Sequence, residues 1–110
     1  MASDQNFVNY ITDQIEDAGE ISAKKMFGEY GLFSDGKIFG LICDNKLFIK
    51  PTRGGRDFIQ NVVEAPPYPG AKSSFLIEDK IDNKEWLSEL VRISLKELPM
   101  PKPKKKKPKR

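Results

Sequence analysis

Short apolar segments separated by turn signals dominate the chain between residues 22 and 50. Asp35 and Gly36 stand between two of these segments, and the Asp-Gly pair readily adopts the positive φ angles of a tight type I′ hairpin. Asp44 and Asn45 predict a second turn in the same way. The pattern therefore predicts sequential antiparallel strands over residues 24–27, 30–34, 37–43 and 46–50.

Two glycines interrupt this strand region near its start. Gly28 and Gly31 flank Glu29 and Tyr30 at the point where the first strand meets the second. Glycine within a strand pattern marks a bulge or a sharp bend. We therefore expect an irregularity of the sheet between these two positions.

Helical patterns stand before and after the strands. Ser3 or Asp4 is placed to cap a first helix, which ends before Gly19. Asp82 followed by Glu85 resembles a capping box at the head of the last helix. The apolar residues at helical spacing are Phe7, Val8, Ile11, Ile15 and Ala18 in the first helix, and Trp86, Leu87, Leu90, Val91, Ile93, Leu95 and Leu98 in the last.

A second helix and one more strand are predicted between these ends. The helix is expected over residues 56–63, entered through Gly54 and Gly55. Residues 65–70 contain three prolines and predict an extended loop, and residues 73–78 predict a strand. The chain is therefore expected to form a two-layer α+β fold, with helices packed on an antiparallel sheet in the order α-β-β-β(-β)-α-β-α.

The strand pattern at residues 38–43 is apolar on both faces. A sheet with one face in water would alternate between apolar and polar residues. Two arrangements therefore stay open: helices cover both faces of the sheet, or a second chain covers one of them, as in a homodimer or a groove for a partner.

The end of the chain differs from the rest in composition. A length of 110 residues fits one domain, which we place at residues 1–98, and residues 99–110 form a Lys/Pro-rich basic tail that is expected to be disordered. Without the tail, the body has 12 basic and 16 acidic groups and a net charge of −4. The tail cations are Lys102, Lys104, Lys105, Lys106, Lys107, Lys109 and Arg110.

Such a tail attracts DNA, RNA, acidic proteins or anionic lipid without reading a sequence. It also resembles a nuclear-localisation run, but we interpret it as a solubilising segment or a weak nucleic-acid tether. A second anion contact is suggested by Lys50, Arg53 and Arg56 around Gly54 and Gly55, because flexible glycines and cations precede the predicted helix there. An ordinary charged loop is the alternative interpretation of that segment.

Several function classes are disfavoured by what the sequence lacks. The absence of histidine removes the commonest general base and most zinc sites. The single cysteine, Cys43, ends an apolar strand and is expected to be a small buried thiol in a reducing cytoplasm. No stretch approaches the ~18 apolar residues of a membrane span. We therefore expect a cytoplasmic protein without catalytic residues, metal or cofactor.

Residues 25–42 read Lys-Met-Phe-Gly-Glu-Tyr-Gly-Leu-Phe-Ser-Asp-Gly-Lys-Ile-Phe-Gly-Leu-Ile, and Leu-Phe-Ile-Lys follows at residues 47–50. This run resembles the signature of the N-terminal domain of the TfoX/Sxy competence-regulator family, and the order of elements is similar over residues 5–98. The motif residues are Met26, Phe27, Gly28, Tyr30, Gly31, Gly36, Phe39 and Gly40.

The resemblance implies a bacterial cytoplasmic protein with a two-layer α+β fold that regulates competence and DNA uptake at the level of transcription. It implies no catalytic residues. The leading hypothesis is a regulatory module that makes protein contacts through the sheet face or the bend at residues 28–31. The alternative is a sequence-independent nucleic-acid binder that acts through the basic tail, and a small enzyme that uses lysine or carboxylate groups is the third class.

Overall fold

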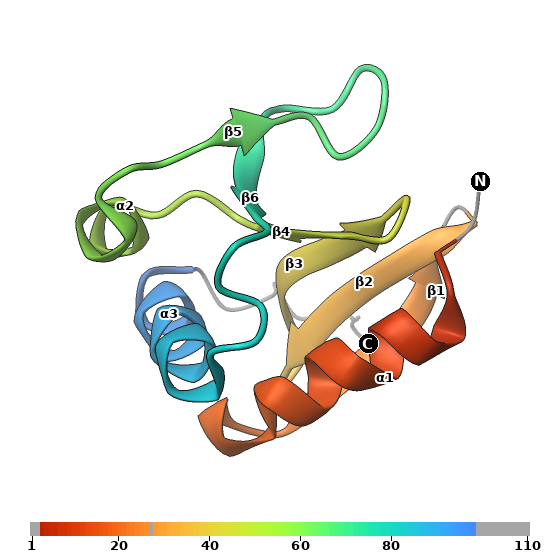
Figure 1. Cartoon of the computed structure of the whole chain (residues 1–110), viewed down its shortest axis with the longest axis horizontal. Coiled ribbons are helices and arrows are strands. Elements are labelled where there is room, and N and C mark those ends of the chain that lie inside the picture. Colours follow the sequence, from red (N-terminus) through yellow and green to blue (C-terminus); the bar gives the residue numbers. More distant parts are fainter. Residues whose placement is uncertain (1–2, 27, 99–110) are drawn as a thin grey trace, which may run out of the picture.

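The computed structural model describes residues 3–26 and 28–98, in which helices pack on one antiparallel sheet (Figure 1). The helices are α1 (Gln5–Gln14), α2 (Arg53–Ile59) and α3 (Lys84–Glu97), with a short 3-10 turn, η1, at Glu16–Ala18. The strands are β1 (Ile21–Met26), β2 (Glu29–Ser34), β3 (Lys37–Cys43), β4 (Lys46–Ile49), β5 (Glu64–Ala65) and β6 (Ser74–Ile77). The strand order is β1-β2-β3-β4-β6-β5. The predicted α+β fold is confirmed.

The turns between the strands form where the sequence predicts them. Asp35 and Gly36 have φ angles of 52° and 82°, and Asp44 and Asn45 have φ angles of 53° and 56°. Two positive central angles are those of a type I′ turn, whose twist matches that of the strands that it joins. Gly28, with a φ of 83°, lies in the sharp turn between β1 and β2.

The irregular pairing lies one residue beyond the predicted segment. Gly31 pairs in register with Lys24 and Leu41, and the register shifts only between Leu32 and Phe33. Phe39 is the extra residue of β3 at this point, and its ring is fully buried. The expected bend is thus found at Gly28, whereas the bulge follows Gly31 because it turns Phe39 into the core.

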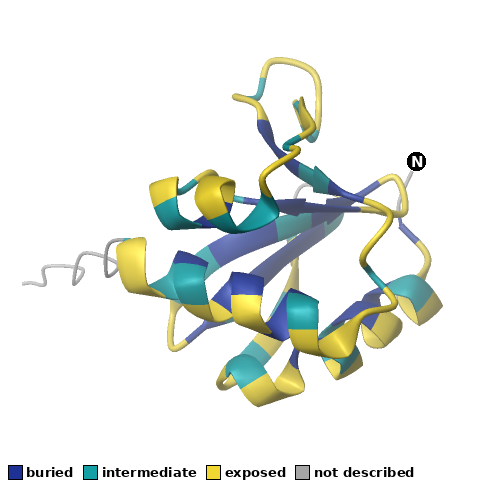
Figure 2. Cartoon of the chain, turned by 60° about the vertical axis from the view of Figure 1, so that its left-hand side comes forward, coloured by how far each residue is buried: buried dark blue, intermediate teal, exposed yellow. Residues whose placement is uncertain are grey.

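The core lies between the sheet and the helices. Figure 2 shows the buried residues gathered where α1 and α3 face the strands. Each large apolar side chain removed from water contributes about 1.5–3 kcal/mol to folding. The fully buried side chains include Leu32, Phe39, Ile42, Ile49 and Phe75 from the sheet, and Val8, Ile11, Leu87, Leu90 and Val91 from the helices.

The second helix begins and ends earlier than predicted. It spans Arg53–Ile59 instead of residues 56–63. The Thr52 side chain accepts a hydrogen bond from the Gly55 amide at 2.9 Å and caps the helix, so both predicted entry glycines lie inside its first turn. Gln60, with a φ of 71°, ends it.

The predicted capping box of the last helix is wrong. Asn83 caps α3, because its side chain accepts a hydrogen bond from the Trp86 amide at 3.1 Å. Asp82 instead accepts a hydrogen bond from the Tyr10 hydroxyl and ties α1 to the start of α3. The two-residue strand β5 was also not predicted, since the prolines that follow it mask its pattern.

The helices leave one face of the sheet open. Figures 1 and 2 show α1 and α3 on the same side of the sheet, and α2 packs on that side too, with Gly55 near the Phe75 ring. Within the described part of the chain, no helix packs over the opposite face of β1, β2 and β3. For residues 3–26 and 28–98, the predicted arrangement with helices on both faces of the sheet is therefore wrong. None of the helices in residues 3–26 and 28–98 is long and apolar enough to cross a membrane.

Candidate functional site

A pocket of about 440 Å³ lies on the open face of the sheet. Its volume falls in the range of roughly 300–1,000 Å³ that is typical of small-molecule sites. We call it the sheet-face pocket, and it is lined by Met26, Glu29, Tyr30, Ile38, Leu41, Cys43, Lys50 and Tyr68. Its wall is mainly apolar, with one acidic and one basic residue. This combination makes it the principal candidate site.

Gly31 lets the apolar side chains of this face close over the sheet. A Cβ atom at Gly31 would overlap Met26 Sδ and would lie 3.0 Å from Phe33 Cε1 and 3.4 Å from Ile38 Cδ1. The Lys24 ammonium covers the Phe33 ring, 5.3 Å from its centroid. The apolar surface therefore depends on a position without a side chain.

The Glu29 carboxylate is occupied by backbone groups of the chain itself. Oε1 accepts a hydrogen bond from the Ser3 amide at 2.8 Å, and Oε2 accepts one from the Asp44 amide at 2.9 Å. Burial raises the pKa of Glu29, but hydrogen bonding with the Ser3 side chain and with the Asp44 and Ser3 amides outweighs that effect and holds the pKa below its usual value. Glu29 thus fixes the N-terminal segment to the turn between β3 and β4.

Cys43 is the buried thiol that the sequence predicts, and only 4% of it is exposed. Burial raises the pKa of the Cys43 thiol, and the carboxylates of Glu29 and Asp44 raise it further. The thiolate is the reactive form of cysteine, so a raised pKa leaves a neutral and poorly nucleophilic group at neutral pH. Cys43 therefore contributes apolar wall to the sheet-face pocket.

Lys50 enters the pocket directly after β4. Its amide donates a hydrogen bond to the Phe39 carbonyl at 2.9 Å, and its side chain is on the same face as that of Phe48 two residues earlier. Among residues 3–26 and 28–98, no hydrogen bond or ion pair engages Lys50 Nζ. Tyr68, which is 50% exposed, reaches the same pocket from the proline loop.

The rest of the predicted anion segment is used within the chain. The amides of Arg53 and Gly54 donate to Glu97 Oε1 at 3.0 Å and to Glu97 Oε2 at 2.5 Å. The Gly55 amide is taken by the cap residue of α2. The N-terminus of α2 therefore already holds a carboxylate from the end of α3.

Arg56 also has partners inside the described chain. Its guanidinium forms an ion pair with Glu64 at 2.6 Å and lies 5.4 Å from the centroid of the Phe75 ring. Lys50 is thus separated from Arg53 and Arg56 and lies with Met26 instead. The tail residues Lys102, Lys104, Lys105, Lys106, Lys107, Lys109 and Arg110 lie outside the described residues, as does Phe27.

The other motif residues have structural positions. Tyr30 is buried, and its hydroxyl donates to Gln5 Oε1 of α1 at 3.0 Å. Gly40 permits close pairing of β3 with β4, because a Cβ atom there would lie 2.6 Å from the Phe48 carbonyl oxygen. Gly28 and Gly36 have positive φ angles in turns.

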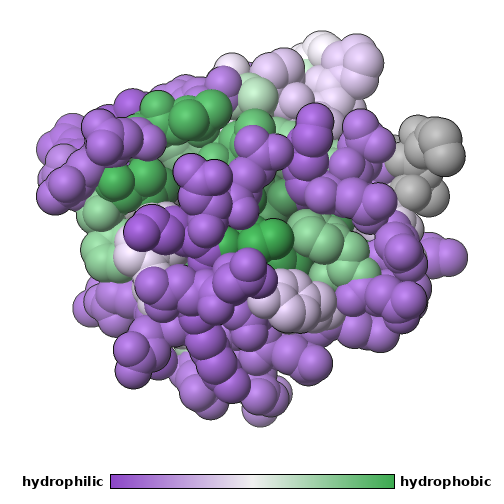
Figure 3. Space-filling model, viewed as in Figure 1, coloured by the Kyte–Doolittle hydropathy of each residue, from purple (hydrophilic) through white to green (hydrophobic). Residues whose placement is uncertain are grey.

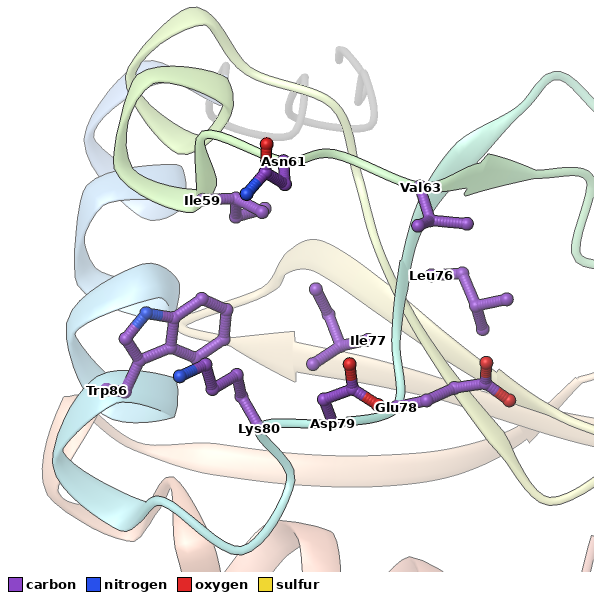
Figure 4. Close-up of a pocket in the computed structure, with 9 residues that line it drawn as sticks. All are labelled: Ile59, Asn61, Val63, Leu76, Ile77, Glu78, Asp79, Lys80 and Trp86. Atoms are coloured by element: carbon purple, nitrogen blue, oxygen red, sulfur yellow. The ribbon is translucent and has the colours of Figure 1, made fainter.

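A second hollow of about 250 Å³ lies among α2, β6 and the start of α3. Figure 4 shows Trp86 and Ile59 on one side of it and Val63 and Leu76 on the other. Trp86 packs against Phe58 with ring centroids 5.3 Å apart. Figure 3 shows apolar surface over α2 and the chain that follows it, interrupted by polar side chains. The remaining residues that line the second hollow are Asn61, Ile77, Glu78, Asp79 and Lys80.

No metal-binding chemistry accompanies these hollows in the part of the chain that the structure describes. There, no group of three His, Cys, Asp or Glu residues is arranged to hold a metal ion.

Sequence reasoning missed Tyr68 as a site residue. Nothing local distinguishes this tyrosine from the prolines around it, and its role depends on how the loop folds back toward the sheet. Ile38 and Leu41 were indicated only indirectly, by the lack of polar alternation in β3.

Comparison with known proteins identifies the family of this chain. The chain is 38% identical over 109 residues to an uncharacterised 12.7 kDa protein encoded in the 5′ region of trpE in Spirochaeta aurantia, a match that covers 99% of this chain and 95% of that protein. The family model of the TfoX N-terminal domain matches residues 13–98, which include every strand and two of the three helices named above. The chain therefore belongs to the TfoX N-terminal domain family.

Proposed function

We propose that this protein is a non-catalytic regulatory module that binds a protein partner through the open face of its sheet. The observation that carries the proposal is the half-exposed apolar surface of Met26, Phe33, Ile38 and Leu41, over which no helix of residues 3–26 and 28–98 packs. Apolar surface rimmed by polar residues is typical of protein interaction sites. Membership of the TfoX N-terminal domain family supports a regulatory role and makes the control of competence genes in a bacterial cytoplasm the process to test.

The chemistry of the sheet-face pocket supports binding over catalysis. Catalysis of proton or acyl transfer needs a group that can accept a proton or attack a substrate. The Glu29 carboxylate accepts hydrogen bonds from two amides, and burial raises the pKa of the Cys43 thiol, which further disfavours the reactive thiolate. The chain contains no histidine to activate either group.

The test replaces apolar side chains of the open face in the native organism. We expect Ile38→Gln and Leu41→Gln to abolish the transcriptional changes that distinguish the wild type from a deletion strain, and to lower the frequency of DNA uptake. Val63→Gln is the matched control, because Val63 is an exposed aliphatic residue (58%) that borders the second hollow instead. Folded, normally abundant open-face variants with wild-type transcript profiles would refute the proposal.

The charge of the tail favours a second candidate, a sequence-independent nucleic-acid binder. Seven cations in the last nine residues can neutralise several phosphates, whereas the body has a net charge of −4. On duplex DNA each neutralised phosphate contributes about −0.9 to the slope of log K against log salt, so partial engagement predicts a slope of roughly −3 to −6. Deletion of residues 99–110 should abolish this binding and leave the melting temperature nearly unchanged. Persistent binding by residues 1–98 would show that the body, not the tail, contacts DNA.

A further inference from the structure

The geometry points to a small-molecule site in addition to the proposed protein contact. The sheet-face pocket binds a small organic anion that has an apolar body and one carboxylate, and this carboxylate pairs with Lys50. The volume of about 440 Å³ suits a small molecule, and the lining combines a largely apolar wall with few polar groups. That composition is typical of small-molecule sites, in which polar groups fix the orientation of an apolar ligand.

The apolar body of the ligand is accommodated by side chains from two strands, β1 and β3. Met26, Ile38 and Leu41 line the pocket from β1 and β3, and the Met26 and Ile38 side chains pack over Gly31 of β2, which has no side chain to displace them. Cys43 adds a buried thiol to the same wall. A ligand that covers these groups removes their apolar surface from water.

The unmatched charge in the pocket is that of Lys50. Its ammonium has no ion-pair partner within the described residues, whereas the carboxylate of Glu29 already accepts two backbone hydrogen bonds. Hydrogen bonds between an ammonium and a carboxylate are stronger than those between neutral groups. The pocket therefore favours a negative group beside Lys50.

The positions of the two charges also limit the ligand to one carboxylate. The backbone of Lys50 is bonded to Phe39 near the start of β3, and Glu29 is bonded to Asp44 just beyond the end of β3. A second negative group on the ligand would approach Glu29 and be repelled. Tyr68 is placed at the pocket by the proline loop, and its phenol supplies a further donor to the bound carboxylate.

The test is an NMR titration of the full-length, ¹⁵N-labelled protein with octanoate and 2-naphthoate, each compared with its neutral amide. We expect the acids to cause saturable shifts in the backbone amide signals of Gly31, Leu41 and Cys43. The neutral amide ligands should bind more weakly. Lys50→Met should weaken binding of the acids roughly 10- to 100-fold, the effect of losing a hydrogen bond to a charged group, and should weaken binding of the neutral amide ligands less. Lys46→Met is the matched control, since Lys46 is an exposed lysine at the other end of β4.

The titration tests both the pairing with Lys50 and the location of the site. Equal affinity for acid and amide, or an unchanged acid affinity in Lys50→Met, would overturn the pairing with Lys50. Shifts confined to the tail or to the second hollow would overturn the location. If Lys50→Met does not give a native spectrum, Ile38→Gln serves instead: the proposal requires it to weaken the acid and the amide alike, and undiminished binding overturns it.

Discussion

The contact between α2 and α3 predicts that Glu97→Ala destabilises the domain although Glu97 is exposed. Its carboxylate accepts hydrogen bonds from the amides of Arg53 and Gly54, which are the first two residues of α2. These amides have no partner inside their own helix, so a carboxylate there acts as a cap supplied from a distant part of the chain.

The expected loss follows from two effects of known size. Loss of a side-chain cap costs about 1 kcal/mol, and removal of a negative charge from a helix N-terminus costs about 0.3–1 kcal/mol at an exposed site. We therefore expect a loss of about 1–2 kcal/mol in the free energy of unfolding. A change of 1 kcal/mol lowers the melting temperature of a domain of this size by roughly 4–8 °C.

Urea denaturation followed by far-UV circular dichroism measures this loss, and Glu89→Ala provides the control. Glu89 lies on the same helix and forms only an exposed ion pair with Arg92 at 3.2 Å, which is worth about 0–1 kcal/mol. Equal effects of the two substitutions would refute the assignment of Glu97 as a cap.

A substitution from the other side of the contact tests the same reasoning. A Cβ atom at Gly54 would overlap the Glu97 carboxylate and would lie 2.8 Å from Ile93 Cγ2. Gly54→Ala should therefore destabilise the domain. In the Gly54→Ala background, Glu97→Ala should cost much less stability than it does in the wild type, because the effects of substitutions at residues in direct contact are not additive. Full additivity would contradict the contact.

Three further predictions concern single side chains. Hydrogen bonds lower the pKa of Glu29 in the folded state. Its contribution to stability is therefore present above the unfolded-state pKa of about 4.3 and is lost as the pH falls through the folded-state pKa. Glu29→Gln should thus reduce the acid-dependent loss of stability that urea titrations measure at pH 3–6. Trp86→Ala should cost about 2 kcal/mol by thermal denaturation, below the roughly 3–5 kcal/mol of a fully buried aromatic, because Trp86 packs against Phe58 but borders an open hollow. Cys43 should react with a thiol reagent at pH 8 far more slowly in the native protein than in urea, and equal rates would contradict its burial.

The two tight turns and the strands β2, β3, β4 and β6 could be predicted from the sequence because their causes are local, whereas β5 was missed and β1 begins three residues before the predicted strand. Asp35-Gly36 and Asp44-Asn45 consist of residues that favour the positive φ angles found here, and the apolar segments on either side define the pairing. The first helix is similarly local, since the Asp4 side chain caps it by accepting from the Asn6 amide at 3.1 Å.

The boundaries of α2 could not be predicted in this way. Thr52 is an ordinary N-cap residue, but the two glycines after it disfavour a helix by roughly 1 kcal/mol each. They are tolerated because Gly54 receives the Glu97 carboxylate and Gly55 packs against Phe75, from whose ring an added Cβ atom would lie only 3.1 Å away. Both contacts come from residues far away in the sequence, so no local pattern indicates them.

The site was predicted only in part for the same reason. Lys50 was grouped with Arg53 and Arg56 by sequence proximity, yet the end of β4 directs it to the open face while the arginines follow α2. Tyr68 joins Lys50 only through the path of the proline loop. Site residues that come together through strand pairing and loop folding, such as Lys50 and Tyr68, can be identified only from the tertiary structure.

The motif residues divide into those that build the sheet and those that present its surface. Gly28 and Gly36 form turns, Gly40 admits the backbone of β4, and Phe39 fills the core, so substitution at these positions tests folding. Met26 instead lies on the open face, where its side chain packs over Gly31, a residue without a side chain. Function should therefore be probed at Met26 and its neighbours Ile38, Leu41 and Lys50, where a side chain can change without removing a turn or a close backbone contact.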